Sequence, residues 1–170
     1  MSRLGRFISI AVIGLGIAAL AIGIAFVVEG QSKANYIKEQ MRAEQVTLAV
    51  LKVEGTDPNN LVDSAAEAEK VANKLKEHRR TYYAATYSDL TALSPNGQYN
   101  PNPAENPNAY TQLKYAQAMN LENSLYLSVT ALGLTTVTIV SGIFMMVTGL
   151  GLSLIGFAVQ RLAKKLPATA

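Results

Sequence analysis

The chain has 170 residues, of which 49% are hydrophobic and 16% are charged, and it contains one His, no Cys and no Trp. The absence of Cys excludes disulfide frameworks, Cys-ligated zinc sites and thiol nucleophiles, and one His is too few for the usual multi-His metal sites. All 12 acidic residues lie between Glu29 and Glu122, whereas residues 7–28 and 123–160 carry no charge. Two such long apolar stretches predict an all-α integral membrane protein with two transmembrane helices and a small helical domain between them.

The first apolar stretch, residues 7–28, is long enough to be a transmembrane helix. As a helix it would extend about 33 Å, which exceeds a hydrocarbon core of about 30 Å. A cleaved signal peptide is the alternative, but its apolar region would be shorter and would end at a small-residue cleavage site. No convincing site of that kind follows Val28. We therefore expect an uncleaved anchor.

Small residues form two rows on this predicted span, and such rows allow helices to approach closely in lipid. Gly and Ala are also common in membrane helices generally. Even so, we predict contact with the second span or with another chain. The row that we predict to pack consists of Gly14, Ala18, Ala21 and Ala25, preceded by Ala11. The second row consists of Ser9, Gly16, Ala19 and Gly23.

The second uncharged stretch belongs to a long helix, residues 125–160, that contains the second span. Residues 125–159 alone would extend about 52 Å, more than the roughly 40–45 Å of a whole bilayer. We place the membrane portion near residues 140–159 and expect residues 125–139 to project from it. A re-entrant hairpin is the alternative, but no Pro or Asn-Gly turn interrupts the stretch. Three glycines recur every seven residues and predict a seam facing the first span: Gly142, Gly149 and Gly156.

Basic residues at the two ends predict the orientation. Short flanks rich in Lys and Arg stay on the cytoplasmic side. The flanking residues are Arg3 and Arg6 before the first span and Arg161, Lys164 and Lys165 after the second. We therefore expect a plasma-membrane protein with residues 1–6 and 161–170 in the cytoplasm and residues 29–124 outside the cell. The inverted orientation remains an alternative, because the intervening segment also contains ten Lys and Arg residues.

Two helical extensions of the spans are predicted in the intervening segment. The stretch Gln31–Leu51 contains no Pro or Gly and continues the first span. Residues 94–108 are rich in Pro and Asn, and we expect them to form an irregular, exposed loop. Within that loop, Asn106 and Pro107 suit the cap and first position of a helix that runs into the second span.

The clearest amphipathic helix lies between these two extensions. Ser64 and Glu67 match a capping box at its start. Behind them, an apolar stripe at helical spacing is expected to be buried: Ala68, Val71, Leu75, His78, Tyr82 and Ala85. We interpret the single histidine as packed between helices rather than as a ligand. Because none of the three helical pieces can bury its apolar side alone, we expect them to pack on one another or on a partner.

No residue is predicted to be catalytic, metal-binding or cofactor-binding. An enzyme would be indicated by a base beside a nucleophile or by paired carboxylates in an apolar setting. The acidic residues instead lie on charged helix faces or in turns, and neither span contains an ionisable residue, which argues against a proton channel. Four tyrosines around the loop suit an interface, although they suit an internal core equally well: Tyr82, Tyr87, Tyr110 and Tyr126.

Three short sequences occur in order along the chain: AEQVT at 43–47, TYSDL at 86–90 and MNLENSL at 119–125. With this layout the chain resembles a family of short bacterial two-span membrane proteins of uncharacterised function, some of which carry automatic labels as ring-opening dioxygenases. The Pro- and Asn-rich loop departs from the family pattern. The resemblance implies the two-span topology but no activity, and the composition gives no support for a dioxygenase.

These features predict a non-enzymatic membrane protein that acts as an assembly or accessory subunit, with other membrane chains or as a homo-oligomer. The alternative is an extracytoplasmic sensor or ligand-binding module that signals through a partner chain. The lipid bilayer is the partner that the composition itself indicates. The segment between the spans carries ten basic against twelve acidic residues, so nucleic-acid binding, which needs a basic patch, is not expected.

Overall fold

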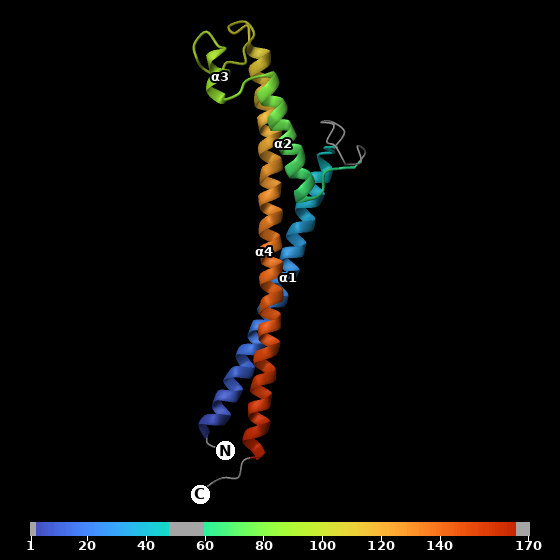
Figure 1. Ribbon diagram of the computed structural model, residues 1–170, viewed down its shortest axis with the longest axis vertical. Helices are drawn as coiled ribbons and strands as arrows, with labels where there is room; N and C mark the ends of the chain where they lie inside the picture. The colour runs from blue at the N-terminus through green and yellow to red at the C-terminus, as the bar shows by residue number, and fades with distance from the viewer. Residues whose placement is uncertain (1–2, 48–59, 166–170) are drawn as a thin grey trace. The chain divides into compact units, whose positions relative to one another are not determined.

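The computed structural model describes residues 3–47 and 60–165, which are helical apart from turns and loops (Figure 1). In chain order the helices are α1 (Arg3–Ala43), α2 (Ala65–Tyr82), α3 (Tyr87–Ala92) and α4 (Ala109–Lys165). The described residues contain no strand beyond an isolated antiparallel bridge between Thr47 and Leu61. The all-α class predicted from the sequence is therefore confirmed for this part of the chain.

The chain divides into two compact units. One, which we call the two-helix unit, comprises residues 1–35 and 134–170, and the other, the head unit, comprises residues 36–133. Each unit has its own packing.

Helices α1 and α4 are long and apolar enough to cross a membrane, with candidate spans in Gly5–Ala43 and Ala109–Leu162. Only 11% and 17% of their most apolar stretches are buried. A helix at the core of a soluble domain would be mostly buried, so these apolar surfaces are not explained by packing within the chain. Both helices therefore suggest a membrane protein.

Helix α1 ends earlier than the sequence suggested. We expected it to reach Leu51, but it ends at Ala43, and residues 48–51 lie outside the described residues. The physical reason is at Gln45, whose φ of 51° is left-handed and incompatible with a continuing helix. The chain turns back there, and the backbone N–H of Val62 donates to the carbonyl of Val46 at 2.9 Å.

Helix α4 is one continuous helix of 57 residues, as predicted for the long second helix. Asn106 lies in the turn before it, where its Oδ1 accepts a hydrogen bond from the backbone N–H of Asn108 at 3.0 Å. Asn106 and Pro107, predicted as the cap and first position of the helix, thus precede it, and the first helical bond runs from the backbone N–H of Gln112 to the carbonyl of Asn108 at 3.0 Å. The helix therefore begins in the head unit and continues without a break into the two-helix unit.

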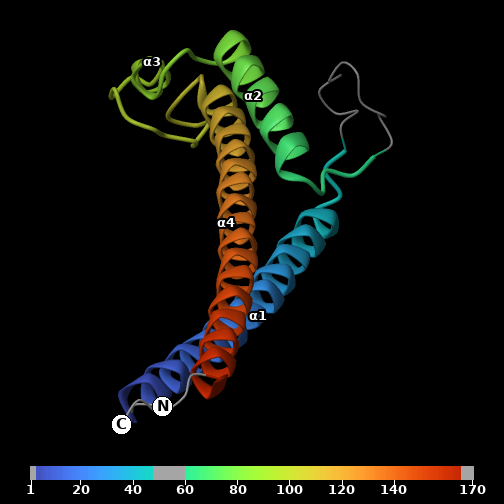
Figure 2. The same ribbon diagram turned by 60° about the horizontal axis from the view of Figure 1, so that its bottom comes forward.

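In the two-helix unit α1 and α4 lie side by side and antiparallel in both views (Figures 1 and 2). The buried positions recur every seven residues, as in a coiled coil, but they carry small side chains. On α1 they are Ser9, Gly16, Gly23 and Gly30, and on α4 they are Thr135, Gly142, Gly149 and Gly156, with Ser153 buried between the last two. Large apolar side chains, such as Ile17, Ile24 and Phe144, are exposed.

In the head unit α2 lies along the first part of α4 (Figures 1 and 2). The predicted start of α2 is confirmed, because Ser64 is its cap and accepts from the backbone N–H of Glu67 at 3.3 Å. The Glu67 carboxylate accepts in turn from the Ser64 hydroxyl at 2.8 Å. A separate apolar cluster beneath α3 consists of Ala84, Leu90 and Tyr115, with Tyr83, Tyr99 and Met119 packed against it.

The buried face of α2 differs from the predicted stripe. His78, Tyr82 and Ala85 were expected to be buried but are exposed, and Ala85 lies beyond the end of α2. The rings of His78 and Tyr82 have their centroids 4.4 Å apart. Arg79 takes the buried position instead. A residue three or four positions after Leu75 can face the same side of the helix, so either His78 or Arg79 could be buried. Arg79 is the buried one because it pairs with a carboxylate of α4.

Candidate functional site

The backbones of α1 and α4 meet at their glycines in the two-helix unit. A Cβ added to Gly149 would lie 2.5 Å from the carbonyl oxygen of Gly16, and one added to Gly23 would lie 2.6 Å from the carbonyl oxygen of Gly142. Real Cβ atoms essentially never come so close to backbone atoms. The helices therefore approach backbone to backbone, as small-residue interfaces in membranes allow.

The glycines of α4 that we predicted to form a seam lie at this contact. Gly142 and Gly149 face Gly23 and Gly16, and Gly156 faces Ile13 and the backbone of Ser9. A Cβ at Gly30 would lie 2.6 Å from the Ile139 side chain, which extends the seam by one more repeat. Four heptad positions of α1 thus pack against four of α4.

The row that we predicted as the packing face of α1 is not in this seam. A Cβ added to Gly14 would meet no atom within 4 Å, and Ala18, Ala21 and Ala25 are exposed. Ala18 lies two residues from both Gly16 and Leu20. Two residues correspond to a rotation of about 200° around an α-helix, so Ala18 lies almost opposite the side of α1 that carries Gly16 and Leu20. Helix α4 therefore packs on the second small row, and the predicted row occupies the opposite face of α1.

This opposite face has the shape of a shallow groove. Large exposed side chains flank the small row on both sides, since helical geometry places Ile10, Ile17 and Ile24 along one edge and Leu15 and Ile22 along the other. Rows of small residues allow a second helix to approach closely in lipid. Within the described residues nothing of this chain covers the row.

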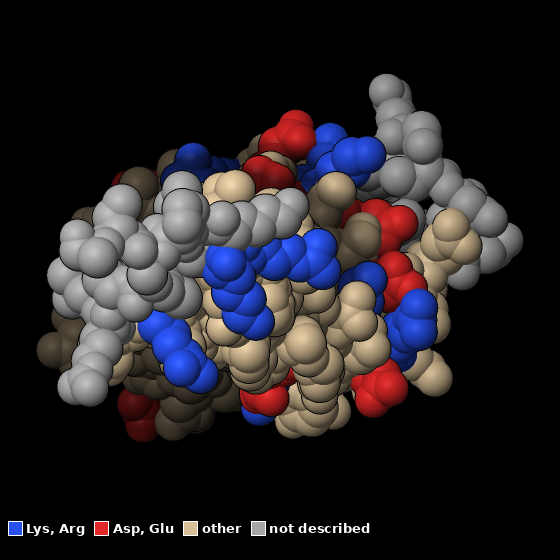
Figure 3. Space-filling model, turned by 90° about the horizontal axis from the view of Figure 1, so that it is seen from below, with Lys and Arg blue, Asp and Glu red and all other residues tan. Residues whose placement is uncertain are grey.

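Basic side chains collect where α1 begins and α4 ends. Because the two helices are antiparallel, and Gly156 lies against Ser9, Arg6 and Arg161 belong to the same end of the two-helix unit. Both are exposed, as is Lys164. Figure 3, which looks onto this end, shows Lys and Arg side chains around it. The two basic flanks recognised in the sequence thus lie on one side of the apolar pair.

A buried ion pair joins α2 to α4 in the head unit. Arg79 Nε donates to Glu122 Oε2 at 2.9 Å, and each side chain is 7% exposed. The Arg79 guanidinium also lies over the ring of Tyr115, 4.6 Å from its centroid, which is a cation–π contact. Sequence reasoning missed this pair, because Arg79 stands among the many charges of α2 and Glu122 among polar residues of α4.

The Pro- and Asn-rich loop is anchored by one buried side chain, Gln112. Its Oε1 accepts from the backbone N–H of Asn100 at 2.6 Å and from Asn106 Nδ2 at 3.1 Å. Its Nε2 donates to the carbonyl of Leu90 at 3.0 Å. The expectation of an exposed, irregular loop is therefore only partly right, because Ser94 and Asn106 are buried and the loop is tied to α3 and α4.

The tyrosines around the loop differ in their exposure. Tyr82, Tyr87 and Tyr110 are exposed, whereas Tyr115 is the tyrosine of the core. Tyr126 is half-buried and donates from its hydroxyl to Asn73 Oδ1 at 2.6 Å. Burial, followed by the nearby carboxylate of Glu122, raises the pKa of the Tyr126 phenol. Tyr126 thus serves the contact of α2 with α4.

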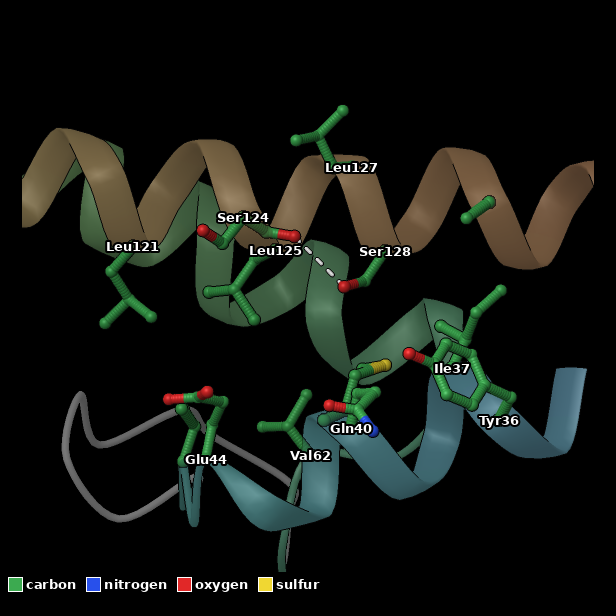
Figure 4. A pocket seen from close by; sticks show the side chains of 13 residues that line it. Tyr36, Ile37, Gln40, Glu44, Val62, Leu121, Ser124, Leu125, Leu127 and Ser128 are labelled. Atoms are coloured by element: carbon green, nitrogen blue, oxygen red, sulfur yellow. Dashed lines mark hydrogen bonds between the residues drawn. The ribbon is translucent and has the colours of Figure 1, made fainter. Parts of the chain in front are cut away.

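A groove of about 420 Å³ lies between the end of α1 and α4, entirely within the head unit (Figure 4). Leu121 and Leu125 point from α4 towards α1, whereas Leu127 points away. Most of the lining is apolar: Ile37, Met41, Val46, Val62, Leu121, Leu125, Leu127 and Ala131. The polar lining consists of Tyr36, Gln40, Glu44, Ser124 and Ser128.

No protein-family model, curated protein or solved structure matches this chain. The resemblance to a family of short two-span membrane proteins therefore stays a prediction. The described residues also contain no group of three or more His, Asp or Glu side chains placed to hold a metal ion. The features from which a function can be argued are thus the outer face of α1, the basic end and the groove.

Proposed function

We propose that this chain is a non-enzymatic subunit of the plasma membrane that assembles with other membrane chains, or with copies of itself, through the outer face of α1. One observation supports this most directly. Helix α1 carries small residues on two opposite faces, and its own partner α4 occupies only one of them. In lipid an exposed small row offers a close contact that another helix can fill.

The basic end supports the proposed orientation. With Arg6, Arg161 and Lys164 at one end of the helix pair, a single cytoplasmic surface would satisfy the preference of both flanks. The head unit would then lie outside the cell. A receptor-like function is the second candidate, and the groove in the head unit supports it, because clefts of this size commonly take small ligands.

The assembly proposal is tested by measuring the mass of the full chain in mild detergent. The wild type should carry a stoichiometric partner or form a homo-oligomer. Gly14→Leu combined with Ala18→Leu fills the groove on the outer face of α1 and should release the single chain. Because Gly14 has no neighbouring atom, these changes leave the α1–α4 pair intact.

A matched control separates this effect from general damage. Gly151→Leu places the same side chain on α4 at a position with open space around it, and it should leave both the mass and the thermal melt unchanged. A wild type that is monomeric without a partner contradicts the proposal. So does a Gly14→Leu, Ala18→Leu variant with the mass of the wild type.

A further inference from the structure

The groove of the head unit combines an apolar floor with one row of polar side chains. Tyr36, Gln40 and Glu44 recur every four residues and so follow one side of α1 and its final turn. This row extends about 12 Å along the helix axis. Ile37 and Met41, one residue further on, also line the groove, and Leu121 and Leu125 point towards it from α4 (Figure 4). The groove is therefore elongated, apolar below and polar along one edge.

The charge of the groove is confined to one end. Among the thirteen described lining residues, Glu44 alone carries a charge. Figure 4 places Glu44 beside Leu121 at one end and Tyr36 beside Ser128 at the other. The Ser128 hydroxyl is already used, since it donates to the carbonyl of Ser124 at 3.0 Å. The strongest hydrogen-bond acceptor open to a ligand is thus the Glu44 carboxylate.

We propose that this groove binds an aliphatic amine with a single apolar chain, its ammonium group at Glu44 and its chain between Met41 and Leu125. An ammonium donor and a carboxylate acceptor form a charge-assisted hydrogen bond, about twice as strong as a neutral one. The Gln40 amide oxygen supplies a second acceptor one turn away. A ligand with a carboxylate or phosphate group would instead be repelled by the negative charge of Glu44.

The size of the groove limits the apolar part to one chain. Ligand sites range from about 300 to 1,000 Å³, and 420 Å³ lies near the lower end. Replacing water at the half-buried lining residues Ile37, Val46 and Leu121 by a hydrocarbon chain is favourable by the hydrophobic effect. The apolar floor therefore supplies affinity, and Glu44 supplies the preference for an amine.

The inference is tested on the full chain in lipid nanodiscs with a dodecylamine that carries a diazirine near the end of its chain. After illumination, mass spectrometry should find the label on peptides that contain residues 36–44 and 121–131. Unlabelled dodecylamine should compete at lower concentration than dodecanol, and dodecanoate should compete least. Label spread along the lipid-facing parts of α1 and α4, or equal competition by dodecanoate, overturns the proposal.

Two variants distinguish the contribution of the ligand's ammonium group from that of its hydrocarbon part. Glu44→Gln should weaken competition by dodecylamine about tenfold and leave dodecanol unchanged, whereas Glu39→Gln, on the same helix outside the groove, should change neither. Ala131→Phe narrows the far end and should weaken both ligands alike. An amine that binds Glu44→Gln as well as the wild type contradicts the assignment. The competition by dodecylamine, dodecanol and dodecanoate on the wild type tests the proposal even if a variant fails to fold. The Gly14→Leu variant should bind dodecylamine as the wild type does, because the groove is independent of assembly.

Discussion

The guanidinium of Arg79 and the carboxylate of Glu122 meet at 2.9 Å with each side chain 7% exposed, which makes them the buried charged link between α2 and α4. Arg79→Met leaves a buried carboxylate without its cation, and we expect it to destabilise the head unit by about 3–5 kcal/mol. The thermal melt followed by circular dichroism in detergent measures this loss. Arg80→Met, at the exposed neighbouring position, should cost little.

The double variant Arg79→Met, Glu122→Leu distinguishes the pair from general packing. It removes both charges and fills similar volume, so it should recover most of the stability lost in Arg79→Met. A double variant that is less stable than either single variant would show that the charges themselves hold the helices together.

The backbone contact of Gly16 with Gly149 predicts a sharp difference between two glycines of α4. Gly149→Leu forces α1 and α4 apart, at a cost of about 1–3 kcal/mol from overpacking, whereas Gly151→Leu meets open space. Spin labels at Phe7 and Phe157, both exposed, report the separation. We expect a longer and broader distance distribution for Gly149→Leu alone, and equal distributions in the two variants would refute the seam.

Gln112 makes three hydrogen bonds from a fully buried side chain. Gln112→Leu removes them and leaves the backbone N–H of Asn100 and the carbonyl of Leu90 without this partner, at about 1–3 kcal/mol for each group that stays buried. Hydrogen exchange should therefore accelerate across residues 94–108. Gln117→Leu, at an exposed position of the same helix, is the control and should leave the exchange of that loop unchanged.

The orientation predicts which side chains an impermeant reagent reaches. The chain has no Cys, so single cysteines at Asn96 and Ala168 can be labelled in intact cells without background. We expect labelling at position 96 and protection at position 168 until the cells are opened. The reverse pattern would place the head unit in the cytoplasm.

The long-range pattern of charge and hydropathy was sufficient to predict α4 as one helix, and the local capping motif of Ser64 and Glu67 was sufficient to predict the start of α2. The packing face of α1 was harder. The row with Gly14 and the row with Gly16 both have helical spacing, and periodicity alone does not show which one meets α4. A signal was present nevertheless, because Gly16, Gly23 and Gly30 repeat every seven residues as Gly142, Gly149 and Gly156 do. Ending the span at Val28 left the third glycine out.

Other features depend on contacts between residues distant in the sequence. Arg79 and Glu122 are 43 residues apart, and each alone reads as an ordinary surface charge. Gln112 does not lie within a clear apolar stripe, so the sequence pattern does not predict that it is buried. Val46 and Val62 reach the groove because the chain reverses at Gln45, a conformation that residue type alone does not predict.

The repeated glycines allow more than one alignment of the helix pair. Sliding α1 by one heptad, about 10 Å, would set Gly16, Gly23 and Gly30 opposite Gly156, Gly149 and Gly142, an equally close backbone fit. That shift would also carry Glu29 and Lys33 level with the apolar side chains that precede them now, which lipid penalises. Glycine thus decides how near the helices come without fixing one register, and in lipid the salt bridge Glu29–Lys33 would disfavour the shifted alignment.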